Sequence, residues 1–369
     1  MSISSLRASH LLLTTAVLGG SLSLGGCDEA TNVGQDEVTL RQGSGVGGMT
    51  FNTSNWVSAG ARDIYEYDRD GNWYTNSFGF ETRLAKVIFD DPDFGLISSD
   101  PAGAKVMGDA RVEISSAGEL ELTVFPPTSG APKTYSGSDL VGMELKFKVK
   151  YNGSSSYTTK LRLLDTSVDP FSGALYEFYK VDPNTGDLLA PVCETSTLGD
   201  RFARFYGDVR VNAITGAVDE PQGIIHIACT AGAPGKSSIY GYLPHGAPET
   251  FRLANRVIRA DYCADGYPYT YPGNSLMMRD NFSPGQEGQT LADVYASLDG
   301  DELEAMWSVD GILCIDTPRV DTLEQVDVIC PVKTVNGQAE YNWRPPPCDT
   351  FVDPAPQELR FFSLTSSET

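Results

Sequence analysis

Hydrophobic and polar side chains alternate strictly along residues 143–151. The apolar positions are Met143, Leu145, Phe147, Val149 and Tyr151, and the polar positions between them are Glu144, Lys146, Lys148 and Lys150. A period of two predicts a β-strand with one face in the core and the other in water. Asn152-Gly153 tolerates positive φ angles, and residues 157–163 return to a strand pattern, so the segment predicts an antiparallel hairpin.

Two further hairpins are predicted nearby. Residues 111–114 and 119–124 flank a Ser-Ala-Gly turn, and residues 174–181 and 188–189 flank an Asp-Pro-Asn-Thr-Gly turn. A helical spacing appears at 248–262, where Pro248 stands at the start and Phe251, Ala254 and Ile258 share one face. A second, short helix is expected between Gly288 and Met306. The pattern therefore predicts a mainly β fold (α+β), an antiparallel, sandwich-like body with one main helix near 248–262.

The first 26 residues have the pattern of a secretory signal. Arg7 precedes an apolar, Leu-rich run from Leu11 to about Leu24, which is too short and too rich in Gly and Ser for a membrane-spanning helix. The run ends in Leu24-Gly25-Gly26-Cys27, which resembles the lipobox of bacterial lipoproteins, in which the cysteine thiol receives a lipid. We therefore expect a lipid anchor on Cys27 and a place in the bacterial cell envelope, on the periplasmic or cell-surface side. The alternative is an ordinary signal peptide followed by an unrelated cysteine.

The rest of the chain divides by composition. Residues 27–48 are polar and rich in Gly, which predicts a tether between the membrane and the body. A β-rich region is expected at 49–140, a second domain at 141–320 and a C-terminal extension at 321–369. Asp28 beside the anchor would resemble an inner-membrane retention signal in enteric bacteria. Other lineages sort differently, so the choice of membrane stays open.

The charge balance is strongly acidic: 49 Asp and Glu against 27 Lys and Arg give a net charge of -22. A polyanion repels nucleic-acid phosphates and anionic lipid headgroups, so nucleic acid is not an expected partner. Residues 66–71 loosely follow the spacing of a calcium loop, but its twelfth position is Ser77 instead of a bidentate Glu. A tight turn at Asp70-Gly71 is the simpler interpretation, and no metal or cofactor is predicted.

Seven cysteines are present. Lipidation of Cys27 leaves six, an even number that favours three disulfides in an oxidising compartment. The preferred pairing is Cys193–Cys229, Cys263–Cys314 and Cys330–Cys348, although six cysteines allow other connectivities. A metal site is disfavoured, because even the closest pair, Cys314 and Cys330, lacks the short C-x2-C spacing of such sites.

The middle of the chain carries a distinctive motif, Ala260-Asp261-Tyr262-Cys263, which is followed later by Trp307 and Cys314. Together with the strand before Cys229 and the Gly241-Tyr242 step, these residues resemble the ADYC-domain family of bacterial lipoproteins and secreted proteins, which has no established activity. The resemblance covers about residues 141–320. The motif residues are Arg259, Ala260, Asp261, Tyr262, Cys263, Asp265, Gly266 and Trp307.

The chain departs from the family at four positions. Relatives carry Gly where Ala264 stands and His where Tyr269 stands, so no role can rest on that His here. They also carry two more cysteines, where this chain has Ser237 and Ala254. The joint loss of both implies a missing disulfide more readily than a missing catalytic thiol.

The motif has two interpretations. In the structural one, Cys263 is bridged, Tyr262 is buried, and Asp261 or Asp265 caps the following turn. In the functional one, Arg259, Asp261 and Asp265 form a charged cluster for metal binding or acid–base chemistry. The structural interpretation is favoured.

No known catalytic motif is present, and catalytic residues are not assigned. His226 lies in an apolar strand run, where a packed position is the usual explanation, and His245 lies in a loop. The favoured function is a non-catalytic binding module of the envelope, with envelope proteins or glycans as candidate partners. The alternatives are a hydrolase with a carboxylate or metal-assisted site near Asp261 and Asp265, and a calcium-stabilised adhesin-like module.

Overall fold

The protein is described by a computed structural model. It describes residues 50–51, 57–101, 108–115, 118–170, 173–196, 199–245, 247–270, 275–283, 286–319, 328–335 and 338–366. The expected leader, Cys27 and the expected tether lie outside these residues. Within them the chain is mainly β, every strand pair is antiparallel, and three disulfides are formed, which confirms the predicted fold class. None of the described helices combines the length and the apolar character needed to cross a membrane.

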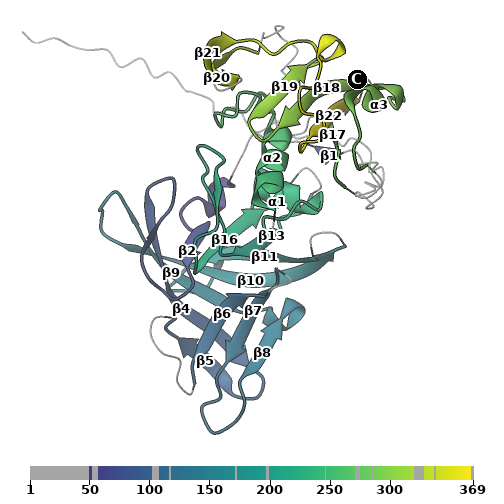
Figure 1. Cartoon of the computed structure of the whole chain (residues 1–369). Coiled ribbons are helices and arrows are strands. Elements are labelled where there is room, and N and C mark those ends of the chain that lie inside the picture. Colours follow the sequence, from purple (N-terminus) through teal and green to yellow (C-terminus); the bar gives the residue numbers. More distant parts are fainter. Residues whose placement is uncertain are drawn as a thin grey trace, which may run out of the picture. The chain divides into compact units, whose positions relative to one another are not determined.

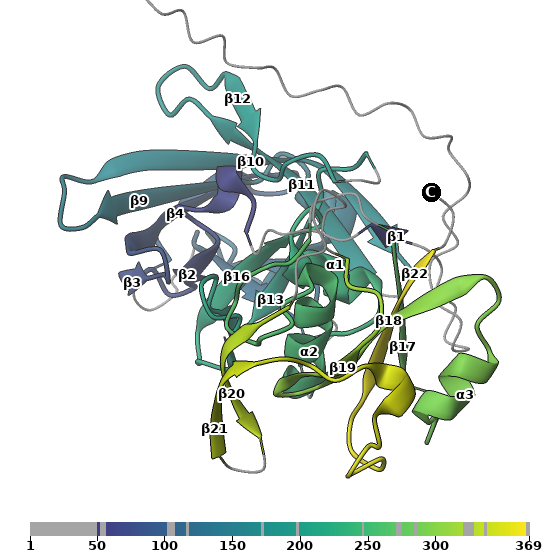
Figure 2. The same ribbon diagram turned by 90° about the horizontal axis from the view of Figure 1, so that it is seen from above.

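The larger of the two main sheets has ten strands (Figures 1 and 2). Its order is β2 (Glu66–Asp68), β16 (Ile224–Cys229), β13 (Ala203–Gly207), β11 (Gly173–Val181), β10 (Tyr157–Asp169), β9 (Glu144–Tyr151), β4 (Phe80–Asp91) and β3 (Tyr74–Thr75), with β12 (Leu188–Pro191) paired to β11 and β5 (Gly95–Ser99) paired to β4. The sheet curls until β2, at one end of this order, contacts β3 and β4 at the other. Its inner face is apolar, and the rings of Tyr67 and Phe147 meet there at 5.0 Å.

The second main sheet has five strands, in the order β1 (Thr50–Phe51), β17 (Ser275–Asp280), β22 (Phe361–Ser366), β18 (Asp301–Ser308) and β19 (Gly311–Ile315). A three-stranded sheet joins β6 (Ala110–Ile114), β7 (Leu120–Val124) and β8 (Lys133–Ser136). Two small hairpins pair β14 (Arg210–Val211) with β15 (Val218–Asp219), and β20 (Cys330–Val335) with β21 (Gln338–Trp343). The described helices are α1 (Ala233–Ile239), α2 (Pro248–Arg259) and α3 (Leu291–Ala296), with 3-10 turns at η1 (Ala59–Ala61), η2 (Gly137–Leu140) and η3 (Cys348–Thr350).

The three predicted hairpins are present as β9–β10, β6–β7 and β11–β12. In β9 the alternation is realised as expected, since Leu145, Phe147 and Val149 are fully buried and the lysines between them are not. A local period of two was enough to predict these strands because one face of each is buried and the other is solvated.

The main helix is confirmed but is shorter than predicted. It ends at Arg259, because Ala260 takes the left-handed conformation (φ 50, ψ 42) and closes the helix. The expectation of a helix up to residue 262 was therefore three residues too long.

The second predicted helix is real only in part. It covers Leu291–Ala296 and begins with a capping box between Thr290 and Asp293. The expectation that it extends toward Met306 is wrong, because residues 301–308 form β18. The second half of this strand is buried on both faces, so its sequence shows no alternation and resembles a buried helix. Helix α1 was not predicted, since it is one short segment with Pro234 and Gly235 near its start.

Helices α1 and α2 contact each other, as both views show (Figures 1 and 2). The apolar face of α2 is fully buried, and its Phe251 meets the Tyr206 ring of the ten-stranded sheet edge-on at 5.6 Å. Helix α2 also contacts β18 and β22 of the five-stranded sheet. It therefore carries core contacts to both main sheets.

Cys193 is bonded to Cys229, as expected, but the other two expected bridges are wrong. The structure joins Cys263 to Cys330 and Cys314 to Cys348. The reason lies in β18 and β19. Cys314 is the strand partner of Met306, and both belong to a small core cluster that also contains Cys348.

Cys263 belongs instead to the main core cluster, together with Trp307 and Cys330. Met306 and Trp307 are consecutive on β18 and therefore point to opposite faces, and Cys263 and Cys314 belong to the two different clusters. Sequence spacing does not show which cluster a cysteine joins.

The sequence boundaries near 140 and 320 do not separate independent sheets. Strand β4 pairs with β9 across the first, and β22 pairs with β17 and β18 across the second. The described residues from Thr50 onward belong to one compact unit.

The corrected connectivity predicts the result of a non-reducing peptide map. A digest of the native protein is expected to release Cys263 linked to Cys330, and Cys314 linked to Cys348. Replacing Cys263 and Cys330 by Ser is expected to lower the free energy of unfolding by about 4 kcal/mol, because that bridge closes a long loop. A peptide joining Cys263 to Cys314 would contradict the structure.

Candidate functional site

The Ala260–Cys263 motif forms the tight turn that follows α2. Asp261 is fully buried, and its carboxylate accepts hydrogen bonds from the backbone N–H groups of Asp265 and Gly266, each at 3.1 Å. Gly266 has φ +87, and a Cβ there would come within 2.1 Å of the Ile214 carbonyl oxygen. The turn therefore depends on a buried acceptor at 261 and on glycine at 266.

Two arginines from the last turns of α2 hold this turn and a neighbouring one. Arg259 donates to the Gly266 carbonyl at 2.9 Å, and Arg256 donates to the Val309 carbonyl, between β18 and β19, at 2.7 Å. Arg256 Nε also lies 3.8 Å from Asp261 Oδ2. Burial raises the pKa of Asp261 to about 6, although Arg256 and Arg259 act in the opposite direction.

Tyr262 joins the motif to the five-stranded sheet. Its hydroxyl donates to Glu304 Oε1 at 2.6 Å and accepts from the Arg319 N–H at 2.9 Å. Its ring stacks on Trp307 with the centroids 5.3 Å apart, and Trp307 donates to Ser363 Oγ at 2.8 Å. Burial raises the pKa of Tyr262, so this hydroxyl stays protonated and available as a donor.

An ion pair and a disulfide complete the junction. Arg319 Nε lies 2.7 Å from Glu304 Oε2, and both side chains are buried. Cys263 is bonded to Cys330 on β20. The motif thus fastens the end of α2 to β18 and β20 and to the segment around Arg319.

The structure therefore brings the predicted motif residues together in a turn that connects α2 to the five-stranded sheet and to β20. Asp261, Arg259 and Tyr262 are buried, whereas Asp265 is exposed and accepts from the Tyr267 N–H. Asp261 and Asp265 consequently do not converge on a common solvent-facing point. This arrangement matches the structural interpretation of the motif.

The departures from the family have simple explanations in this geometry. Ala264 has φ 58, a conformation in which glycine is less strained than alanine. Ser237 and Ala254 are fully buried on α1 and α2, which contact each other, so cysteines there would face the helix interface. Tyr269 packs its ring 5.3 Å from that of Tyr262.

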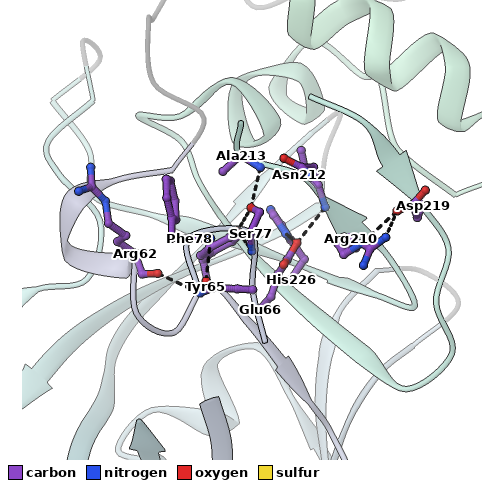
Figure 3. Close-up of polar contacts among 12 residues, drawn as sticks. Arg62, Tyr65, Glu66, Ser77, Phe78, Arg210, Asn212, Ala213, Asp219 and His226 are labelled. Atoms are coloured by element: carbon purple, nitrogen blue, oxygen red, sulfur yellow. Dashed lines mark hydrogen bonds and ion pairs between the residues drawn. The ribbon is translucent and has the colours of Figure 1, made fainter. Parts of the chain in front are cut away.

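A buried polar pair lies on the ten-stranded sheet (Figure 3). Glu66 on β2 and His226 on β16 are strand partners, both are fully buried, and His226 Nδ1 lies 3.1 Å from Glu66 Oε1. The same oxygen accepts the Val211 N–H at 2.9 Å. Tyr206, the next partner in the row, stacks on the His226 ring at 6.0 Å.

The pair has the chemistry of an orienting carboxylate and an imidazole. His226 Nε2 and Glu66 Oε2 have no hydrogen-bond partner among the residues that the structure describes. Next to them Tyr65 and Ser77 share a hydrogen bond at 2.5 Å, and Ser77 accepts the Ala213 N–H (Figure 3). Because both members of the pair are sealed from solvent, the arrangement joins the β2 edge to β16 and to the β14 segment. In the sequence, Glu66 stood out only as a possible calcium ligand.

The 66–71 segment has the geometry of a turn. The side chain of Glu66 points to His226. Asp68 Oδ1 accepts hydrogen bonds from the backbone N–H groups of Asp70 at 2.8 Å and Asn72 at 3.2 Å. Across the described residues, no group of three or more His, Cys, Asp or Glu side chains is placed to hold a metal ion.

One exposed feature stands out against the acidic composition. The outward positions of β4, β9 and β10 lie in register, because Arg83 is opposite Lys148, Lys86 is opposite Lys146, and Lys146 is opposite Lys160. We call this surface the cationic face. Its seven cations are Arg83, Lys86, Lys146, Lys148, Lys150, Lys160 and Arg162.

Comparison with known proteins identifies one family. A sequence model of the ADYC domain matches residues 137–321. No curated protein and no solved structure matches the chain.

The raised pKa of Asp261 predicts how the Asp261→Asn variant responds to pH. Between about pH 4 and pH 6 the folded protein holds a proton that the unfolded chain has released, so the wild type loses stability as pH rises. The neutral variant lacks this loss. The stability difference between wild type and variant should shrink by about 2 kcal/mol from pH 4 to pH 7. Urea unfolding at both pH values measures it, and a difference that is constant or grows with pH would contradict the assignment.

Two substitutions at Glu66 test the buried pair. Glu66→Leu leaves the Val211 N–H and the His226 Nδ1–H without an acceptor, and it should lower the free energy of unfolding by about 3–5 kcal/mol. Glu66→Gln keeps an acceptor oxygen and should cost less than half of that. Thermal and urea unfolding of the two variants provide the comparison. Equal losses would show that the hydrogen bonds to Glu66 do not support the sheet.

Proposed function

The chain belongs to the ADYC-domain family, and on this basis we propose that it is a lipid-anchored protein of the bacterial cell envelope that acts as a non-catalytic binding module. The observation that carries this proposal is the use made of the family motif. The reactive group of each motif residue is bonded within the fold. The Asp261 carboxylate accepts hydrogen bonds from backbone N–H groups, the Tyr262 hydroxyl donates to Glu304, and Cys263 forms a disulfide with Cys330. A motif used in this way maintains a scaffold, and the activity then belongs to surfaces that the scaffold displays.

The extracytoplasmic location has two independent supports. The first is the leader-like pattern that ends at Cys27. The second is the set of three disulfides among the six remaining cysteines, since such bridges persist in oxidising compartments and are rare in reducing ones. A lipid on Cys27 would make the membrane the first partner, and envelope proteins or glycans are the candidate further partners.

The hydrolase alternative near Asp261 and Asp265 has one observation in its favour. A carboxyl group whose pKa is raised to about 6 is a suitable general acid or base. Against it stands the geometry, because Asp261 is fully buried and already accepts two backbone hydrogen bonds. A substrate could reach this carboxylate only after the turn had opened.

The anchor is tested directly by substitution at Cys27. Wild-type protein expressed in a bacterium is expected to incorporate labelled palmitate and to fractionate with membranes, whereas Cys27→Ser should do neither. Cys348→Ser is the matched control, since it removes a cysteine of the described body and should keep the label. Wild-type protein without label would overturn the lipoprotein proposal.

A further inference from the structure

The cationic face reverses the charge of the chain over a limited area. Four carboxylates, Glu81, Asp90, Glu144 and Asp165, occupy outward positions on the same strands, and Asp100 lies 3.8 Å from Arg83. Seven cations against five carboxylates leave two positive charges unbalanced, on a chain whose net charge is -22. Such a separation of charge creates a local field that the net charge does not describe.

The centre of the face holds the charges that the protein does not neutralise. Lys150, Lys160 and Arg162 have ion-pair partners in Glu81 and Glu144. Lys146 and Lys148 make no ion pair with any residue that the structure describes, and their side chains lie on the solvated side of β9. These two lysines are therefore free to meet an external anion.

The face has limits along the strands. Farther along β10 the charge changes sign at Asp165, which is the strand partner of Glu177 on β11. At the other end, next to the β9–β10 turn, lies Trp73, with 40% of its surface exposed. Lys150 Nζ is 3.8 Å from the centroid of the Trp73 ring.

We propose that the cationic face docks on the anionic headgroups of the lipid membrane to which the chain is anchored. Lysines attract headgroup phosphates, and a Trp side chain prefers the interface between headgroups and water, so the lysines and Trp73 suit the same occupant. The acidic remainder of the chain is repelled by the same membrane, which turns this face toward it. The inference rests on the proposed envelope location, because the anchor supplies the membrane.

The length of the N-terminal segment allows this contact. Between Cys27 and the first described strand the chain can reach at most roughly 80 Å when fully extended. The body therefore cannot leave the neighbourhood of the membrane surface once Cys27 carries a lipid. Confinement of this kind raises the effective concentration of headgroups at the face, so weak individual contacts suffice.

The test uses the full mature chain with Cys27→Ser, so that no lipid contributes to binding. It is mixed with vesicles of phosphatidylcholine alone or of phosphatidylcholine with phosphatidylglycerol, and binding is measured by co-sedimentation. Binding is expected only to the anionic vesicles and should fall as NaCl is added. Lys146→Glu with Lys148→Glu should weaken it by at least about ten-fold.

The control is Arg111→Glu with Lys133→Glu, on the separate β6–β8 sheet. It changes the net charge by the same amount, and its side chains have 37% and 43% of their surface exposed. It should bind like the parent chain. Three results would overturn the proposal. They are an equal loss of vesicle affinity in both double variants, no binding to anionic vesicles, and binding to soluble heparin or DNA without binding to vesicles. Because Cys27 is already substituted, a negative result here would leave the palmitate-labelling result standing.

Discussion

The junction between the two main sheets depends on one buried carboxylate. Asp261 lies where α2 ends. The two hydrogen bonds that its carboxylate accepts from backbone N–H groups fix the direction in which the chain leaves the helix. That direction places Tyr262 against Trp307 and Cys263 within bonding distance of Cys330. A charged acceptor forms stronger hydrogen bonds than a neutral one, but it loses hydration when it is buried. The fold compensates with Arg256 and Arg259, which also hold the carbonyl groups of the neighbouring loops.

Similar buried polar contacts occur at two other places. Glu304 and Arg319 pair beneath Tyr262, and Glu66 and His226 pair across the edge of the ten-stranded sheet. A buried ion pair adds little net stability compared with apolar residues of the same size, but removing one partner is costly. Such pairs therefore favour one arrangement of strands over others. The Glu66–His226 pair joins segments 160 residues apart in sequence, which suits a fold whose strands return to form a nearly closed sheet.

The sequence predicted what depends on neighbouring residues and missed what depends on distant ones. The alternation along 143–151 predicted β9, and the Asn-Gly pair predicted its turn, because both signals are local. The partner of Glu66 is 160 residues away, and no local pattern could relate it to His226. The pairing of Cys263 with Cys330 likewise depends on which of two core clusters each cysteine joins, and distant segments build those clusters. The capping of the turn by Asp261 was predicted, because an Asp that precedes a Gly turn after a helix is a local feature as well.

The cationic face shows why composition alone misleads about surfaces. Net charge is a sum over the chain, whereas a docking surface is defined by which side chains become neighbours when strands pair. The three lysines of β9 were visible in the sequence, but on one strand they indicate only a solvated edge. Only the register of β4 and β10 places Arg83, Lys86 and Lys160 beside them. Strand pairing thus concentrates positive charge on a polyanion, and the surrounding acidic surface restricts the orientations in which the body can approach an anionic membrane. The same register that builds the core on the inner face of these strands therefore also sets the electrostatics of the outer one.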